Sequence, residues 1–551
     1  MNGLSELDVE SSTRIGRLRS RLLSLCSIPS RSAWGEGESQ VMDFIGRTLD
    51  GLCGSSRGLK VFRYPLPLDP FGRHHVAALW RHPGGGRATV VLVAHVDVVD
   101  ERDYGSLSHL AFDPVGLTEA LKGCEHLPKE ARRDLERGYL FGRGTLDVKA
   151  GLAIEMVLME ELAMGTVDVG VNVLFLPVVD EERDSVGMRG AVGFMRDLAE
   201  AEGLDYVACV NTEPSELGSS GEDLPIFIGS VGKLMPFALL VGKGAHVGEP
   251  WQGLNAAYLA SRVVSSLEGV SWSAESLGDQ KLPPMTCIGL EILRDSYSVT
   301  LPDMAMAYFN KLTVSSDHRS LLDRFKAEVM ISLKEAVGHI AHEFRLLGLP
   351  EIHVAKGSRV FEVREVIRLA QSMGFDPNGA ASRLDPREDT RGQSVRVLLE
   401  ALRVLRLEPP LAVVGFLPPY YPPKLNRGCV EKDARLRKEM ERLASLWSRE
   451  EAIRYRVEEV FGGITDLSFL GGFVGEEDFA AVMDNMPGGS HLYPMDYQAM
   501  ACLDVPVVNL GVKGRDAHKW TERLDLAYSF GVLPDLMIQT LRALGGSADL
   551  S

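Results

Sequence analysis

The sequence predicts an α/β fold with a mixed central sheet, interrupted by an inserted ferredoxin-like unit. Two observations lead to this prediction. Short runs rich in β-branched residues alternate with helical patterns along much of the chain, which is typical of α/β domains. Between about residues 231 and 357 the pattern becomes β-α-β-β-α-β, which is the order of a ferredoxin-like unit.

The first part of the chain, residues 1–230, contains three strand-like runs. ATVVLVAH (88–95), VNVLFLPVV (171–179) and YVACVN (206–211) are short and apolar, which favours buried strands. Helical patterns lie at 152–164 and 191–201. We therefore expect a sheet whose strands alternate with helices.

The insertion is predicted to span residues 231–357. Its strands are expected in LMPFALLVG (234–242), MTCIGLEIL (285–293), MAMAYFNKLTV (304–314) and EIHVA (351–355), and its helices over 255–267 and 321–347.

The first domain is expected to resume at residue 358 and to continue to 551. It would carry an additional segment at about 358–430, with two helical stretches and the strand LAVVGF (411–416). The following LPPYYPPK excludes a helix or a central strand, because proline lacks the N–H group that both require. A charged helix is predicted over 431–460, and VPVVNLG (505–511) is the last predicted strand.

Composition bears on partners and location. The net charge of −17 argues against nucleic acid or an anionic membrane as a partner, because both need an excess of Lys and Arg. The N-terminus lacks the basic and apolar regions of a signal peptide, and no run is long enough to span a membrane. The seven cysteines are scattered without a CxxC pair, so we expect reduced cysteines and a cytoplasmic protein.

Potential metal ligands follow four of the strand-like runs. In open α/β sheets, ligands bind outside the carboxyl ends of the strands, so these side chains should converge. One histidine in such a place is usually a loop residue, but a complete set in this order points to a metal. Imidazole and carboxylate ligands suit zinc, with cobalt or manganese as alternatives. The candidates are His95, Asp147, Glu182, Glu213 and His518.

Competing catalytic motifs are incomplete. His342-Glu343 lacks the second histidine of HExxH, and GSVGKL lacks the spacing of a P-loop. The sequence contains no GxSxG nucleophile elbow, and VGKGAH does not match GxGxxG. The set of candidate metal ligands therefore remains the main chemical signal of the sequence.

The combination of HVD, GRGTLDVK, DEE, TEP and AHKWTE resembles the zinc aminoacylase and exopeptidase family, which includes acetylornithine deacetylase, succinyl-diaminopimelate desuccinylase and glutamate carboxypeptidase. The resemblance covers nearly the whole chain. It implies a zinc-exopeptidase catalytic domain with an inserted lid domain, two divalent ions and a small-molecule or short-peptide substrate.

The resemblance also implies individual roles. One ion would bind to His95, Asp147 and Glu213, and the other to Asp147, Glu182 and His518, with Asp147 bridging. Glu181 matches the general base, and Asp97 matches the carboxylate that orients His95. The Asp147–Val148 peptide bond would be cis, and Glu522 matches the glutamate of the terminal motif.

The inserted unit shares a further pattern with the family's lid. GKGAHVGEPWQGLNAAY places His246 where the family has a histidine that enters the partner subunit's site and stabilises the oxyanion, and this implies a homodimer. Asn255 belongs to the same pattern. FGGITD resembles the loop beside the substrate, which makes Thr465 and Asp466 candidate substrate contacts.

The sequence departs from the family in the lid. Val299 replaces an asparagine, and Leu312 replaces an arginine that often binds a substrate carboxylate. Lys311 is adjacent, but neighbouring strand residues face opposite ways. DEERDSVGMR, VVGFLPPYYP and about 70 additional residues resemble the arginine-utilisation (RocB-type) branch.

Three functions remain open. The first is a peptidase or N-acyl amino-acid deacylase. The second is an amidohydrolase acting on a guanidino or carbamoyl compound of arginine breakdown. The third is a binding or regulatory protein that has lost catalysis, which the intact Glu181 and ligand set argue against.

Overall fold

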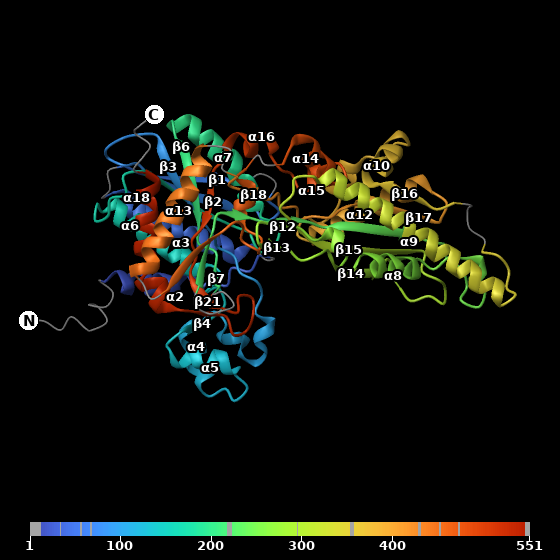
Figure 1. Ribbon diagram of the computed structural model, residues 1–551, viewed down its shortest axis with the longest axis horizontal. Helices are drawn as coiled ribbons and strands as arrows, with labels where there is room; N and C mark the ends of the chain where they lie inside the picture. The colour runs from blue at the N-terminus through green and yellow to red at the C-terminus, as the bar shows by residue number, and fades with distance from the viewer. Residues whose placement is uncertain are drawn as a thin grey trace, which may run out of the picture. The chain divides into compact units, whose positions relative to one another are not determined.

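A mixed sheet of eight strands and a second sheet of six strands form the centres of two structural units (Figure 1). The first unit comprises Met1–Ser230, Lys424–Gly471 and Gln498–Ser551, and the second comprises Val231–Pro423 and Gly472–Tyr497. The computed structural model describes residues 13–32, 35–54, 58–66, 69–216, 223–294, 296–352, 357–427, 431–450, 453–471 and 474–545.

The sheet of the first unit has the order β1-β2-β5-β3-β6-β20-β8-β19. Its central strands β5, β3, β6 and β20 are parallel, whereas β1 and β2 form an antiparallel edge. This confirms the predicted α/β class with a mixed sheet. The strands are β1 (Leu59–Pro65), β2 (His74–Trp80), β3 (Ala88–His95), β5 (Asn172–Val178), β6 (Asp205–Asn211), β8 (Asp223–Phe227), β19 (Arg454–Glu458) and β20 (Val507–Asn509).

Helices and short strands complete the first unit. The helices are α2 (Arg14–Cys26), α3 (Glu36–Cys53), η1 (Arg102–Leu110), α4 (Pro114–Lys122), α5 (Lys129–Glu136), α6 (Lys149–Ala163), α7 (Val186–Glu202), α13 (Glu431–Glu450), η4 (Asp466–Phe469), α16 (Tyr497–Leu503), α17 (Leu526–Gly531) and α18 (Leu533–Gly545). A small sheet joins β4 (Leu140–Phe141), β22 (Arg523–Leu524), β21 (Lys513–Arg515) and β7 (Ser215–Glu216), and β9 (Gly229–Ser230) pairs with β18 (Lys424–Leu425).

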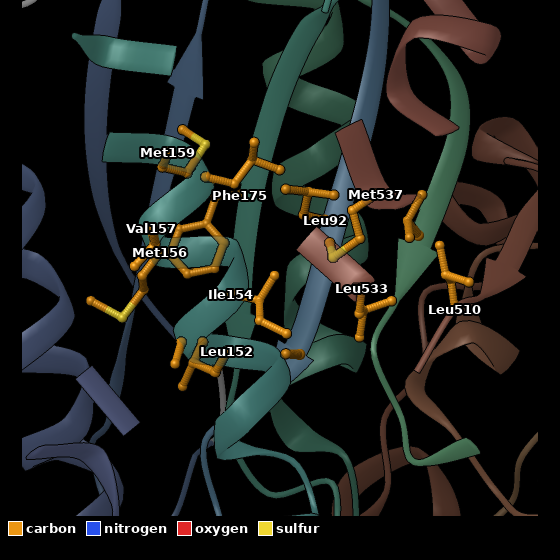
Figure 2. Close-up of a cluster of buried hydrophobic side chains, with 14 of the residues drawn as sticks. Leu92, Leu152, Ile154, Met156, Val157, Met159, Phe175, Leu510, Leu533 and Met537 are labelled. Carbon is orange, nitrogen blue, oxygen red and sulfur yellow. The ribbon is translucent and has the colours of Figure 1, made fainter. Parts of the chain in front are cut away.

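The core of the first unit lies between the parallel strands and helices α6 and α18. Figure 2 shows Leu92 of β3 and Phe175 of β5 among apolar side chains of both helices. Helix α6 is buried along nearly its whole length, which is typical of a helix that has no solvent-facing side. The labelled helical residues are Leu152, Ile154, Met156, Val157 and Met159 of α6, and Leu533 and Met537 of α18. This packing fixes the strands whose carboxyl ends carry the candidate ligands.

The second unit is built on a sheet with the order β10-β15-β11-β17-β16, in which β14 pairs with the other edge of β15. Helices α8 and α9 pack on one face of this sheet, and α10 and α12 contribute to an apolar cluster on the other. The strands are β10 (Gly232–Leu234), β11 (Pro236–Val241), β12 (Ser276–Leu277), β13 (Gln280–Lys281), β14 (Thr286–Ile292), β15 (Met304–Thr313), β16 (Arg359–Glu362) and β17 (Leu411–Phe416). The helices are η2 (Pro250–Gln252), α8 (Ala256–Leu267), η3 (Ser271–Ser273), α9 (His318–Leu346), α10 (Val363–Ser372), α11 (Pro377–Ser382), α12 (Thr390–Leu405), α14 (Glu476–Met483) and α15 (Gly489–Leu492).

The second unit continues beyond residue 357, where we predicted it to end. Strand β17, which is the LAVVGF run, pairs antiparallel with β11 along its whole length. The order β14-β15-β11-β17 is therefore that of a ferredoxin-like sheet, with β17 as its fourth strand. The predicted fourth strand, EIHVA, lies mostly outside the described residues. The additional segment supplies β16 and helices α10 to α12 to this same unit.

The charged helix predicted over 431–460 is too long. Helix α13 ends at Glu450, and Arg454–Glu458 forms the edge strand β19, parallel to β8. RYRVE alternates polar and apolar residues, and Tyr455 points into the core while Arg454 and Arg456 are exposed. The period-two pattern indicates a strand.

None of the helices that the structure describes is long and apolar enough to cross a membrane.

Candidate metal centre

The candidate ligands of the first unit follow adjacent parallel strands of its sheet. His95 is the last residue of β3, Glu182 follows β5 and Glu213 follows β6. His518 lies in the hairpin between β21 and β22, which comes after β20. Because the carboxyl ends of parallel strands share one edge of the sheet, these side chains converge there.

Asp147 lies between the two histidines and offers one carboxylate oxygen to each. Its Oδ1 is 3.0 Å from Nε2 of His95, and its Oδ2 is 3.2 Å from Nε2 of His518. Asp147 follows β4 and precedes α6, so its backbone is fixed by elements on both sides. The Asp147–Val148 peptide bond is cis, which confirms that expectation.

The two glutamates lie on opposite sides of Asp147. Glu182 Oε1 is 3.0 Å from His518 Nε2, and Glu213 Oε1 is 3.4 Å from His95 Nε2. His95, Asp147 and Glu182 each present a ligand atom within 4.8 Å of the others. The geometry thus brings together all five predicted ligands, with two of them at each end of Asp147.

The backbone of Glu213 packs tightly against Gly511. A Cβ atom added to Gly511 would lie 1.7 Å from the Glu213 carbonyl oxygen, so only glycine fits there. Asn509 of β20 donates a hydrogen bond from Nδ2 to the same carbonyl at 3.0 Å. Strand β20 therefore fixes the backbone from which the Glu213 carboxylate projects.

Asp97 is fully buried and organises the loop that carries the acidic pair. Its Oδ1 accepts a hydrogen bond from the Glu181 backbone N–H at 3.1 Å, and its Oδ2 accepts one from Glu182 at 3.0 Å. Nδ1 of His95 lies 3.5 Å from the same carboxylate and 3.0 Å from the Asp97 carbonyl oxygen. Burial raises the pKa of Asp97, but His95 and these hydrogen bonds outweigh that effect and leave the pKa below its ordinary value.

The carboxylates at this edge crowd one another in a buried place. Burial and the neighbouring carboxylates raise the pKa of Glu181 and of Glu213 well above the ordinary range. The pKa of His518 is raised to about 11 by its hydrogen bonds to Asp147 and Glu182. Buried like charges are costly without a counterion. Two imidazoles and three carboxylates are a donor set that fits zinc, cobalt or manganese, so divalent cations would relieve this repulsion.

The candidate substrate residues of the FGGITD loop lie in the same unit. Thr465 is buried and donates a hydrogen bond from Oγ1 to Ser230 Oγ at 3.0 Å. Asp466 is also buried, and burial raises its pKa to about 7. The negative charge of Asp466 contributes to the raised pKa values of Glu181 and Glu213, so its carboxylate lies close enough to these glutamates to repel their charges.

The remaining predicted site residues lie in the second unit. His246 is exposed, and its Nδ1 accepts a hydrogen bond from the Gly248 backbone N–H at 3.1 Å. Asn255 caps helix α8, and its side-chain oxygen accepts the Ala257 N–H at 2.9 Å. Lys311 is buried and donates hydrogen bonds from Nζ to Glu275 at 2.5 Å and to the Leu312 carbonyl at 2.6 Å. Hydrogen bonds within the second unit therefore hold the Lys311 side chain in place.

Two groups around the centre were not identified from the sequence. Arg143, from the GRGTLDVK motif, forms a buried ion pair with Glu522 at 2.7 Å, and the motif itself was the available signal. Arg73 forms a buried ion pair with Glu38 at 2.6 Å, and Glu38 accepts the Asp180 backbone N–H at 2.9 Å. The sequence around Glu38 and Arg73 carries no motif that links them to the DEE segment.

Comparison with known proteins shows relatives that match over most of their length. The Bacillus subtilis protein YqjN is 32% identical over 497 residues, which cover 87% of this chain and 87% of the relative. Protein RocB of Bacillus subtilis is 25% identical over 537 residues, covering 96% and 94%. The crystal structure of aminopeptidase PepT from Bacillus cereus shares the fold, with a TM-score of 0.53 and 13% identity over 96% of this chain and 98% of that chain.

The family comparison spans all five candidate metal ligands. Residues 91–528 match Peptidase family M20/M25/M40, and this range begins just before His95 and ends just after Glu522. The mixed sheet and the convergence of the histidines and carboxylates agree with the family that the sequence match indicates. The chain belongs to Peptidase family M20/M25/M40.

Proposed function

We propose that this chain is a metal-dependent hydrolase of amide bonds in small substrates, either a peptidase or an N-acyl amino-acid deacylase. One observation carries the proposal: the two carboxylate oxygens of Asp147 face two different histidines, His95 and His518. A carboxylate in that position suits a bridge between two cations. The family match supports hydrolysis as the reaction class.

Two divalent ions would occupy the centre, with zinc as the expected metal and cobalt or manganese as alternatives. One ion would bind to His95, Asp147 and Glu213, and the other to Asp147, Glu182 and His518. When bound, such ions polarise a carbonyl group and lower the pKa of water. The side chains around the ions would carry out the proton transfers and would position the ligands.

Glu181 would act as the general base. Its side chain is buried beside the ligand carboxylates, and burial raises the pKa of Glu181 well above its ordinary value, which makes its carboxylate a stronger base. A carboxylate with these properties takes a proton from the attacking water and passes it to the departing amine nitrogen. Asp97 holds the Glu181 backbone and orients His95, so Asp97 would contribute through position.

The second unit would act as a lid and as the dimer interface. Strand β14 pairs only with β15 among the described strands, and its Ile288, Leu290 and Ile292 are each about half exposed. An open strand edge with exposed apolar side chains suits pairing with a second copy. In such a dimer, exposed His246 would enter the partner's site and stabilise the oxyanion. A monomer whose lid serves its own site is the alternative.

Substrate contacts are proposed for Asn255, Thr465 and Asp466. A second candidate function is hydrolysis of a guanidino or carbamoyl compound of arginine breakdown, and the similarity to RocB supports it. Leu312 stands where the family has an arginine. Leucine cannot pair with a substrate carboxylate as arginine does. A binding protein without catalysis is the third possibility, and the intact Glu181 argues against it.

A substrate screen tests the proposal. The protein reconstituted with Zn²⁺, Co²⁺ or Mn²⁺ is incubated with N-acyl amino acids, dipeptides, and guanidino and carbamoyl acids, and release of the amine product is measured. We expect turnover of one class that a chelator abolishes and added metal restores. Turnover that persists without metal would contradict the proposal, and metal binding without turnover of any class would favour the binding protein.

A further inference from the structure

Arg143 and Glu522 form a buried ion pair that joins the loops carrying two of the proposed ligands. We propose that this pair is a positioning brace, which holds His518 and Asp147 in register and thereby sets the affinity for the ion that His518 and Glu182 would bind. The inference rests on the proposed two-metal function. Neither side chain is itself a candidate ligand.

Glu522 holds the backbone of the bridging aspartate. Its Oε1 accepts hydrogen bonds from the backbone N–H groups of Leu146 at 3.1 Å and Asp147 at 3.3 Å. Its Oε2 accepts one from Arg143 Nη1 at 2.7 Å, and the residue is 1% exposed. Both oxygens of Glu522 are therefore used, one for the Asp147 loop and one for Arg143.

Arg143 continues the connection to the second histidine. Its Nη2 donates a hydrogen bond to the His518 carbonyl oxygen at 3.4 Å and another to Asp103 Oδ1 at 2.8 Å. Its guanidinium also lies over the Tyr104 ring, 5.1 Å from the centroid. A continuous path of hydrogen bonds thus runs from the Asp147 backbone through Glu522 and Arg143 to the His518 backbone.

The loop that carries Asp147 and the loop that carries His518 are attached to the same pair of strands. Strand β4 precedes the Asp147 loop and pairs antiparallel with β22, which follows the His518 loop. The Gly142 N–H donates a hydrogen bond to the Glu522 carbonyl at 3.2 Å, which extends this pairing by one step. Beyond that point the strands no longer pair, and the Arg143 and Glu522 side chains make the next connection.

His518 depends on outside support more than His95 does. Its φ of +65° lies in the left-handed region, which is unfavourable for residues other than glycine and persists when the surroundings impose it. His95, in contrast, ends a strand that is paired on both sides, with β5 and β6. Loss of the brace should therefore weaken the ion at His518 and spare the ion at His95.

The test measures zinc affinity directly. Wild type, Glu522→Ala, Arg143→Met and the double variant Arg143→Met/Glu522→Met are titrated with Zn²⁺ against a chromophoric chelator, and zinc content is measured by elemental analysis. We expect wild type to bind two ions, and each single variant to bind one ion normally and the other about 10–100-fold more weakly, as for other supports of metal ligands. The double variant should be no worse than either single variant, because it leaves no unpaired buried charge.

The controls separate positioning from general stability. Glu362→Gln removes a buried carboxylate that pairs with Arg319 at 2.7 Å in the second unit, and it should leave both zinc affinities unchanged. If the first variants do not fold, Glu522→Gln and Arg143→Lys replace them with the same expectation of a selective loss. Unchanged affinity, or equal loss of both ions, overturns the brace. A wild type that binds no metal overturns the proposed function instead.

Discussion

Oδ1 of Asp97 accepts a hydrogen bond from the backbone N–H of Glu181 at 3.1 Å. The other oxygen of Asp97 accepts the N–H of Glu182, so one buried carboxylate holds two successive peptide groups of the acidic pair. Successive residues whose backbones are fixed in this way must project their side chains differently. This relationship lets the Glu182 carboxylate approach His518.

Replacing Asp97 by asparagine should weaken catalysis and metal binding together. An amide side chain has one acceptor oxygen, so it cannot accept both peptide N–H groups and also orient His95. We expect Asp97→Asn to lower zinc affinity about 10–100-fold, measured by competition with a chelator. Asp100→Asn, at an exposed carboxylate of the same loop, is the control and should behave like wild type. Wild-type affinity in both variants would refute this role for Asp97.

Experiment should distinguish the roles of the two glutamates of the acidic pair. Glu181→Gln removes the proposed base and leaves the ligands intact, so it should retain two ions and lose turnover by about 100-fold or more. Glu182→Gln removes a proposed ligand and should lose one ion. Elemental analysis and initial rates measured on the same preparations distinguish these outcomes. A reversed pattern would show that the two roles are exchanged.

Mixed dimers should recover activity if His246 acts in the neighbouring subunit. His246→Ala chains and Glu181→Gln chains are each expected to be inactive. After subunit exchange, a mixed dimer would contain one site with both groups intact, so part of the wild-type rate should return. Sedimentation gives the subunit count, and differently tagged chains verify the exchange. Verified exchange without recovered activity would mean that His246 serves its own chain or has no role.

The buried imidazole of His318 should make stability depend on pH. Burial lowers its pKa from 6.5 to about 4, and Tyr420 Oη lies 3.3 Å from its Nδ1. Between these values the unfolded chain binds a proton that the folded chain does not, so stability falls as pH falls. From pH 7 to pH 5 the loss should be roughly 2 kcal/mol, because one pKa unit corresponds to about 1.4 kcal/mol.

Urea unfolding of wild type and His318→Gln at the two pH values checks this expectation. The variant has no titrating group at this position and should lose correspondingly less stability on acidification. His109→Gln, at an exposed histidine, should follow the wild type. An identical pH dependence for wild type and His318→Gln would show that His318 does not carry the effect.

Much of the first unit could be predicted from the sequence, because local signals determine it. The runs at 88–95, 171–179 and 206–211 are apolar, β-branched and short, and they form β3, β5 and β6. His95, Glu182 and Glu213 lie at the ends of these strands, so the sheet topology brings these three ligands together. The cis bond after Asp147 could be expected only from family resemblance.

The less accurate predictions concern pairings between distant segments. The fourth strand of the ferredoxin-like sheet is β17, but nothing local in LAVVGF states that it pairs with β11 across the additional segment. The Arg143–Glu522 pair joins residues 379 positions apart, and although each belongs to a sequence motif, neither motif indicates that the two side chains pair. Such pairings arise from tertiary packing, which the periodicity of apolar residues in the sequence does not predict.

The zinc content of wild type and Asp147→Ala tests the central claim most directly. The two carboxylate oxygens of Asp147 face the two histidines, so its loss should remove support for both ions at once. Elemental analysis after reconstitution and desalting should give two ions per chain for wild type and a loss of most metal for Asp147→Ala. Circular dichroism should show that the variant remains folded. Retention of both ions by folded Asp147→Ala would contradict a dinuclear centre at this site.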